Sequence, residues 1–208
     1  MSANSQTTYT HENMTLDHVA SSGTVARPNT RRHRIGKREI VVVDDLFPPE
    51  AVLEIHTFVK QLPYRLNVED SPDSPYPGHR KSELPLVAAV ETPVFKQCMG
   101  LARELAVPAP LRLFRIHSNL HLYGDTQLPH FDRVDGVTVL YHANPEWNER
   151  WMGETIFYDD SRDPVYAVAP RPGRVVVFHG GIWHRGGVPS RECSQGRITV
   201  ALKFEPEP

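Results

Sequence analysis

Residues 197–204, Arg-Ile-Thr-Val-Ala-Leu-Lys-Phe, alternate large apolar side chains with polar or small ones. Successive side chains of a β-strand point to opposite faces, so the stretch predicts a strand with one apolar face. The other face carries Arg197, Thr199 and Ala201. We expect these three residues to line one shared site.

Several short runs rich in β-branched and aromatic residues precede this strand, and they are residues 111–116, 137–141, 165–168 and 174–178. Turn sequences separate them, for example Pro170-Arg-Pro-Gly173 and the pair Gly186-Gly187. No helical pattern lies between the runs. Many short strands without intervening helices predict an antiparallel sandwich, barrel or jelly roll.

The N-terminal half shows helical rather than strand periodicity. A helix is expected to begin near Pro49, because proline is tolerated in a first turn and apolar residues follow it at helical spacing. A second helical pattern begins at Pro93. Residues 64–85 contain four prolines and are expected to form a lid or a binding loop. The fold class is therefore α+β and mainly β, with supporting helices before the β body.

Length and composition indicate one ordinary globular domain. The chain has 208 residues, 39% of them hydrophobic, which predicts a single domain over residues 39–208. Residues 1–38 lack apolar periodicity and end in a basic run, so we expect a flexible polar tail there.

Charge and cysteine content exclude several classes of protein. With 23 basic against 25 acidic residues, the net charge of −2 favours neither a nucleic-acid nor a membrane partner. No stretch approaches the ~18 consecutive apolar residues of a membrane helix, and the N-terminus has no secretory signal. The two cysteines, Cys98 and Cys193, fit reduced thiols, so a cytoplasmic location is expected.

A candidate metal site begins at His130-Phe131-Asp132. About 1.3 such triplets are expected by chance in a chain with this many histidines and acidic residues. The triplet alone is therefore no evidence for a metal site, and the residues around it must supply that evidence. Residues two apart in an extended chain share a face, and His184, which lies beside two glycine turns, supplies a third ligand. Two imidazoles and one carboxylate make the facial triad of non-haem Fe(II) oxygenases.

The strand after His184 predicts a carboxylate-binding site. Arg197 can hold a carboxylate by two parallel hydrogen bonds, and the hydroxyl of Thr199 can add a third. By the same alternation His117, Asn119, His121 and Tyr123 share a face, which places Tyr123 to hydrogen-bond the same ligand.

Taken in order, these motifs resemble the 2-oxoglutarate- and Fe(II)-dependent oxygenases of the prolyl-4-hydroxylase-like branch, over roughly residues 39–204. The resemblance rests on His130-x-Asp132, Asn144-Pro-Glu-Trp147, Gly153-Glu154-Thr155, Pro170–Arg174, His184 and the Arg197 strand. It implies a double-stranded β-helix (a cupin-like jelly roll) with N-terminal helices.

The resemblance also implies a reaction and a set of site residues. Fe(II) would be bound by His130, Asp132 and His184, and 2-oxoglutarate by Arg197 with Tyr123 beside it. The enzyme would use O2 to convert 2-oxoglutarate into succinate and CO2 while it hydroxylates a C–H bond of an amino acid, a small metabolite or a peptide.

Two positions depart from the family pattern. His142 stands where the family often has tyrosine, and a cosubstrate contact is expected there; Met152-Gly153 replaces the usual Gly-Gly pair. The carboxylate at Asp132 disfavours a halogenase. The alternatives are a prolyl hydroxylase of a protein substrate, a cupin-like module that binds metal without 2-oxoglutarate turnover, and a metal-dependent isomerase or lyase.

Overall fold

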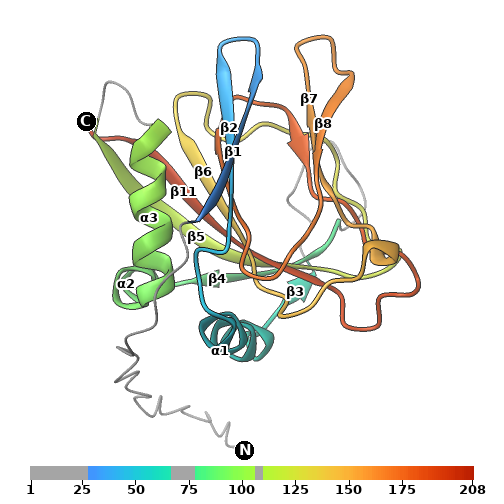
Figure 1. The fold of residues 1–208 in the computed structure, drawn as a ribbon. Coiled ribbons are helices and arrows are strands. Elements are labelled where there is room, and N and C mark those ends of the chain that lie inside the picture. The colour runs from blue at the N-terminus through green and yellow to red at the C-terminus, as the bar shows by residue number, and fades with distance from the viewer. Residues whose placement is uncertain (1–27, 67–77, 106–109) are drawn as a thin grey trace, which may run out of the picture.

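The computed structural model describes residues 28–66, 78–105 and 110–208 (Figure 1). Its helical elements are α1 (Pro49–Lys60), α2 (Leu86–Glu91), α3 (Pro93–Leu105) and the short 3-10 helix η1 (Glu149–Trp151). The strands are β1 (Asn29–Ile35), β2 (Arg38–Asp44), β3 (Arg65–Leu66), β4 (Arg80–Leu84), β5 (Leu111–His121), β6 (Val137–His142), β7 (Thr155–Tyr158), β8 (Pro164–Val168), β9 (Val175–His179), β10 (His184–Arg185) and β11 (Arg197–Pro206).

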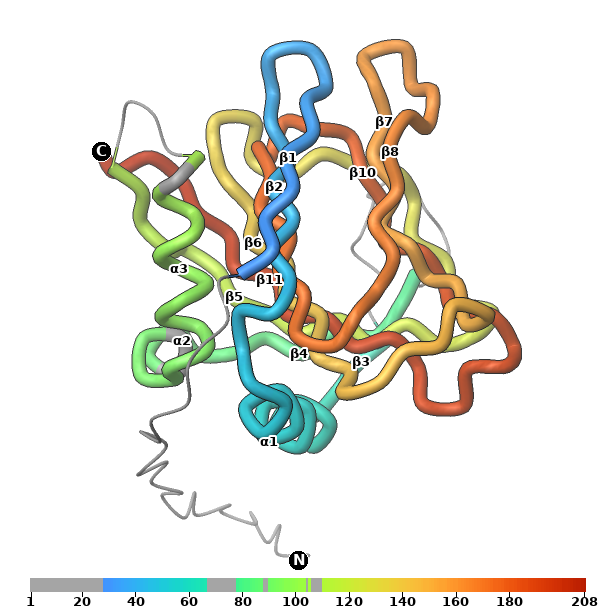
Figure 2. Tube along the Cα trace, in the orientation of Figure 1, coloured from blue at the N-terminus to red at the C-terminus, as the bar shows by residue number. Residues whose placement is uncertain are grey.

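The strands form two antiparallel sheets. The larger sheet has the order β1-β2-β9-β6-β11-β5-β4-β3, and the smaller has the order β10-β7-β8. Figure 2 follows the chain and shows the β1–β2 and β7–β8 hairpins projecting at the same end of the molecule. The prediction of an antiparallel, mainly β fold is confirmed.

Side-chain alternation divides the apolar residues between two cores. On β11, Ile198, Val200, Leu202 and Phe204 point to the outer face of the large sheet and pack with α1 and α3. Ala201 belongs instead to the inner core, where the smaller sheet covers the larger. The inner core contains Ile35, Ile40, Val42, Leu140, Phe157, Val168, Val176, Phe178, Ile182 and Ala201.

The two predicted helices are confirmed as α1 and α3. Val52, Ile55 and Val59 of α1 are buried at the expected helical spacing, and Phe95 and Cys98 of α3 are fully buried. Helix α2 was not predicted, because its sequence Leu-Val-Ala-Ala-Val-Glu is too short to show a period. No helix within the described ranges is long and apolar enough to cross a membrane.

The expected polar tail and the expected loop both contain strands. Residues 29–35 form β1, paired with β2 along its whole length, while residues 1–27 lie outside the described ranges. The polar sequence of β1 is tolerated because Arg31 pairs with Asp44 and Arg32 with Glu39. The segment 64–85 includes β3 and β4, and its residues 67–77 lie outside the description.

Met152 occupies a backbone conformation that favours glycine. Its φ and ψ are 57° and −139°, and Gly153 follows with a φ of 84°. A Cβ atom in this region of backbone space costs of order 1–3 kcal/mol. The Met152-Gly153 pair thus keeps a turn that suits two glycines.

Replacing Met152 by glycine should stabilise the fold. We expect Met152→Gly to raise the free energy of unfolding by about 1 kcal/mol, because the relieved strain exceeds the added entropy of the unfolded chain. Met152→Ala is the matched control, since it removes the exposed side chain but keeps the Cβ atom. Urea unfolding measures both, and equal stabilities of the two variants would contradict strain at this turn.

Candidate metal centre and cavity

The inner faces of two neighbouring strands form the floor of a cavity of about 180 Å³. Strands β5 and β11 are antiparallel, and their inward residues face each other as the cross-strand pairs Arg197–His121, Thr199–Asn119, Ala201–His117 and Lys203–Arg115. All eight residues line the cavity. Since β-strand residues advance about 3.3 Å each, Arg197 and Lys203 begin about 20 Å apart at opposite ends of this floor.

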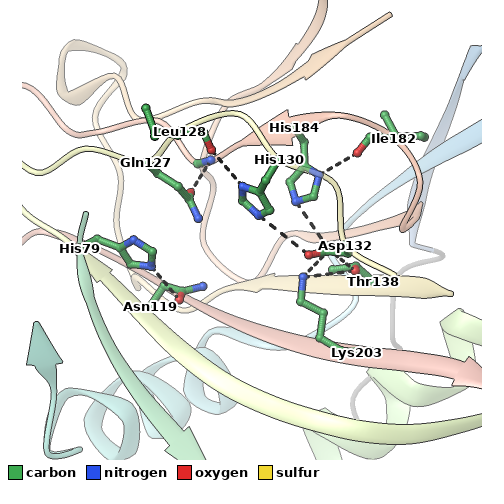
Figure 3. Close-up of polar contacts among 11 residues, drawn as sticks. His79, Asn119, Gln127, Leu128, His130, Asp132, Thr138, Ile182, His184 and Lys203 are labelled. Carbon is green, nitrogen blue, oxygen red and sulfur yellow. Dashed lines mark hydrogen bonds and ion pairs between the residues drawn. The ribbon is translucent and has the colours of Figure 1, made fainter. Parts of the chain in front are cut away.

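The candidate metal ligands meet above the Lys203 end of the floor (Figure 3). His130 Nε2 lies 3.9 Å from Asp132 Oδ1, and His184 Nε2 lies 3.6 Å from Asp132 Oδ2. The ligand atoms of all three residues fall within 4.8 Å of one another. The structure therefore brings together the three residues that the sequence predicted as metal ligands.

Backbone pairing holds the two histidines together. His130 N–H donates to the carbonyl of His184 at 2.9 Å, and His184 N–H donates to the carbonyl of His130 at 2.8 Å. Each imidazole also contacts a carbonyl two residues earlier through Nδ1, His130 with Leu128 and His184 with Ile182, both at 2.9 Å. A carbonyl only accepts, so Nδ1 carries the proton in each ring and Nε2 keeps a lone pair for a metal.

The carboxylate of Asp132 is held in its ionised form. Burial alone would raise its pKa, but the ammonium of Lys203, the imidazole of His184 and hydrogen bonds from Lys203 and Thr138 lower the pKa well below its usual value. Thr138 Oγ1 donates to Asp132 Oδ2 at 2.6 Å, and Lys203 Nζ contacts the same oxygen. Asp132 therefore stays a charged ligand.

Burial keeps His184 neutral at pH 7. It lowers the pKa of His184 to about 4, more than the nearby carboxylate of Asp132 raises it. Metals bind the neutral imidazole, so His184 and the carboxylate of Asp132 are in the protonation states that a divalent ion requires. The donor set of two imidazoles and one carboxylate fits Fe(II) and leaves coordination positions for other ligands.

The far end of the cavity holds a buried cation. Arg197 is 1% exposed, and its guanidinium donates to Thr155 Oγ1 at 2.8 Å. Its Nε and the hydroxyl of Thr199 have no hydrogen-bond partner among the described residues. No carboxylate in those residues lies within ion-pair distance of Arg197, so a carboxylate ligand would satisfy both groups.

Tyr123 does not share the face of His121, and the predicted alternation is wrong there. Strand β5 ends at His121, and Tyr123 lies in the turn that follows, 63% exposed and outside the cavity. The turn breaks the two-residue period, because Asp125 Oδ2 accepts a hydrogen bond from Leu122 N at 2.7 Å. Tyr123 lines a separate surface hollow near Met152.

His142 lies next to the cavity rather than in it. It is the cross-strand partner of Thr199 on β6, is 2% exposed, and is absent from the cavity lining. Burial, together with the charges of Arg197 and Arg174, holds the pKa of His142 well below its usual value. It is therefore a neutral neighbour of the Arg197 end.

Several residues of the site were not predicted from the sequence. His79, which is fully buried, stacks on His121 with ring centroids 4.3 Å apart, and its Nε2 lies 3.1 Å from Asn119 Oδ1. Gln127 accepts a hydrogen bond from Gly186 N at 2.6 Å. Lys81, Thr155 and Lys203 also line the cavity. The sequence held a signal for three of them: Thr155 stands in the Gly153-Glu154-Thr155 motif, Lys81 is a cation of the 64–85 segment that could contact an anionic substrate, and Lys203 is the next inward position after Ala201.

One family model matches part of the chain. Residues 118–204, which include the three candidate ligands and Arg197, match the model of the 2OG-Fe(II) oxygenase superfamily. No curated protein sequence matches the chain.

Solved structures share the fold at low sequence identity. A prolyl-4-hydroxylase from Pseudomonas putida has a TM-score of 0.54 at 16% identity, over 78% of this chain and 89% of that one. A prolyl hydroxylase from Trichoplax adhaerens, in complex with a hypoxia inducible factor peptide fragment, has a TM-score of 0.61 at 15% identity, over 80% and 83%. HygX from Streptomyces hygroscopicus, with nickel and 2-oxoglutarate bound, has a TM-score of 0.51 at 15% identity, over 80% and 82%. The predicted double-stranded β-helix is confirmed.

The depressed pKa of His184 predicts an acid-sensitive fold. The unfolded imidazole takes up a proton near pH 6.5, whereas the folded one does so only near pH 4. Unfolding is therefore coupled to proton uptake between these values, and stability falls as the pH is lowered through that window.

The variant His184→Gln isolates this contribution. Between pH 7 and pH 5 the metal-free wild type should lose about 2 kcal/mol more stability than His184→Gln, since the variant has no proton to take up at this position. Urea unfolding at the two pH values measures the difference. Parallel losses in the two proteins would show that His184 does not titrate in this way.

Proposed function

We propose that this chain is a 2-oxoglutarate- and Fe(II)-dependent oxygenase that hydroxylates a C–H bond of an amino acid, a small metabolite or a peptide. The match of residues 118–204 to the family model and the shared fold support this proposal. One observation carries the proposal. A two-histidine, one-carboxylate cluster and a buried arginine without a carboxylate partner in the described residues line the same cavity.

His130, Asp132 and His184 hold the iron in this proposal. The Nδ1 hydrogen bonds orient both imidazoles, and Thr138 and Lys203 orient the carboxylate. These contacts fix the ligands before the metal arrives, which lowers the entropy that binding must overcome.

Arg197 and Thr199 bind the distal carboxylate of 2-oxoglutarate in this proposal. Nε of Arg197 and Oγ1 of Thr199 are two buried polar atoms without a partner among the described residues, and both residues line the cavity. Thr155 fixes the guanidinium through its bond to the terminal nitrogen. A buried cation of this kind is held in place for an anion that arrives later.

With Fe(II), 2-oxoglutarate and O2 bound, the cofactor chemistry yields succinate and CO2 and inserts one oxygen atom into a substrate C–H bond. The chain's own contribution is to orient the reactants and to exclude water. Phe178 packs edge-on against the His184 ring at 4.7 Å, and Phe131 packs against Trp183 at 5.3 Å beside the metal ligands. No protein group needs to act as a general base.

The two cysteines bear on the compartment in which the protein works. Cys98 and Cys193 are both free and buried, which favours a reducing compartment such as the cytoplasm.

Peptide and small-molecule substrates both remain in the proposal, because the Trichoplax enzyme binds a peptide fragment and HygX has been seen with hygromycin B.

Anaerobic titration of Fe(II) into metal-free protein with 2-oxoglutarate tests the proposal. We expect the visible charge-transfer band of the chelate in wild type and its loss in His184→Ala. Arg197→Ala should keep metal binding but weaken 2-oxoglutarate binding by about 10- to 100-fold, since one charge-assisted hydrogen bond contributes about 1.5–3 kcal/mol.

Arg150→Ala is the matched control, because Arg150 is an exposed arginine that lies outside the cavity and pairs with Glu192. It should bind 2-oxoglutarate like wild type. A folded wild type that binds Fe(II) without producing the band would favour a cupin-like metal protein. An unchanged affinity of Arg197→Ala for 2-oxoglutarate would contradict the proposal that Arg197 binds its distal carboxylate.

A further inference from the structure

Three cations line the cavity floor on either side of His117: Lys203 and Arg115 in one cross-strand row, and Lys81 in the row of Asn119. Lys81 of β4, Arg115 of β5 and Lys203 of β11 all line the cavity. Lys203 and Arg115 are direct cross-strand partners, and like charges in that position repel unless anions lie nearby. The sheet therefore concentrates positive charge beside the metal ligands.

The proposed cofactors do not neutralise this charge. Fe(II) and the dianion of 2-oxoglutarate cancel each other, and Arg197 already serves the distal carboxylate. Lys203 contacts Asp132, and Arg115 contacts Glu83. The side chains of Arg115 and Glu83 are 44% and 56% exposed, and an ion pair this exposed contributes little stability. The Arg115–Glu83 pair can therefore open for a ligand.

A buried histidine among these cations has an open hydrogen-bonding position. His117 lies between Arg115 and Asn119 on the inner face of β5 and is 4% exposed. Its Nδ1 has no hydrogen-bond partner in the described residues. Burial, followed by the charges of Lys203, Lys81 and Arg115, holds the pKa of His117 well below its usual value. The ring is neutral at pH 7 and can donate one hydrogen bond to a ligand.

A second cavity adjoins this group. It has a volume of about 200 Å³ and shares Arg115, Asp132, Thr138 and Lys203 with the first. The rest of its lining is Phe114, Arg133, Val137 and Phe204. A ligand anchored by its charged group at Arg115 therefore has room for a further part close to the metal ligands.

We propose that Lys81, Arg115 and His117 bind an oxyanion of the substrate, so that the enzyme hydroxylates a small carboxylate or phosphate ester. This proposal rests on the proposed function above and specifies its substrate class. Carboxylate and phosphate share the chemistry that two cations and one N–H donor recognise.

Probe binding to the loaded but inactive protein tests the proposal. Wild type is saturated with Ni(II) and 2-oxoglutarate and titrated by calorimetry with benzoate, phenyl phosphate and the neutral benzamide. At least one anion should bind tenfold or more tightly than benzamide. The anion that binds more tightly then identifies the charged group of the substrate as a carboxylate or a phosphate. Arg115→Gln and Lys81→Gln should each weaken its binding about tenfold.

Controls separate this proposal from its alternatives. Arg150→Gln removes the same charge outside the cavity and should bind the anions like wild type. Equal affinities for benzamide and both anions, or anion affinities unchanged in both cavity variants, would overturn the proposal. Loss of 2-oxoglutarate binding in Arg115→Gln would overturn it too, by assigning these cations to the cosubstrate.

The same titration distinguishes failure of this proposal from failure of the function. If wild type does not bind Ni(II) and 2-oxoglutarate, the oxygenase assignment fails and the substrate class fails with it. If the loaded protein forms but shows no preference for an anion, only the substrate class is wrong.

Discussion

The alternation of side chains along β11 is the constraint on which the rest of the structure depends. The strand lies between β6 and β5 in the middle of the large sheet, and both of its faces are buried. One face supplies apolar residues to the core beneath α1 and α3, and the other supplies the cavity floor. A shift of register by one residue would exchange the two faces, placing Arg197 under the helices and Ile198 in the cavity.

That constraint also explains why charges can be buried here at all. An ionised side chain in the interior is costly unless another group compensates it. Lys203 and Asp132 compensate each other, whereas Arg197 has only Thr155 as a hydrogen-bond partner among the described residues. The sheet fixes these residues in rows, so the free-energy cost of burying a charge is confined to defined positions. Those are the positions where ligands would bind.

The metal cluster depends on long-range backbone pairing rather than on local sequence. His130 and Asp132 lie in an irregular segment, and the isolated bridge between His130 and His184 fixes their distance from β10. Asp132 N–H adds a bond to the carbonyl of Gly180 at 2.8 Å. A side chain added at Gly180 would place its Cβ atom 2.2 Å from the carbonyl oxygen of Arg133, so this close approach requires glycine.

Much of the fold and the metal cluster could be predicted from the sequence, because alternation and ligand chemistry are local properties. Strand β11 and the helices α1 and α3 are recognisable from their periods alone. Tyr123 shows the limit, since alternation says nothing about where a strand ends. Strand β1 shows another, because ion pairs with Asp44 and Glu39 replace the apolar pattern that usually marks a strand.

The positions of Lys81, Arg115 and Lys203 around the cavity could not be predicted for a related reason. Lys81 lies in a segment rich in proline, and only its pairing with Asn119 of β5 brings it to the cavity. Arg115 looks like an ordinary surface residue until the register sets it opposite Lys203. Electrostatic recognition depends on distances between strands, which single-strand patterns do not contain. The parts of such a site that choose the substrate are therefore harder to predict from sequence than the parts that bind the metal.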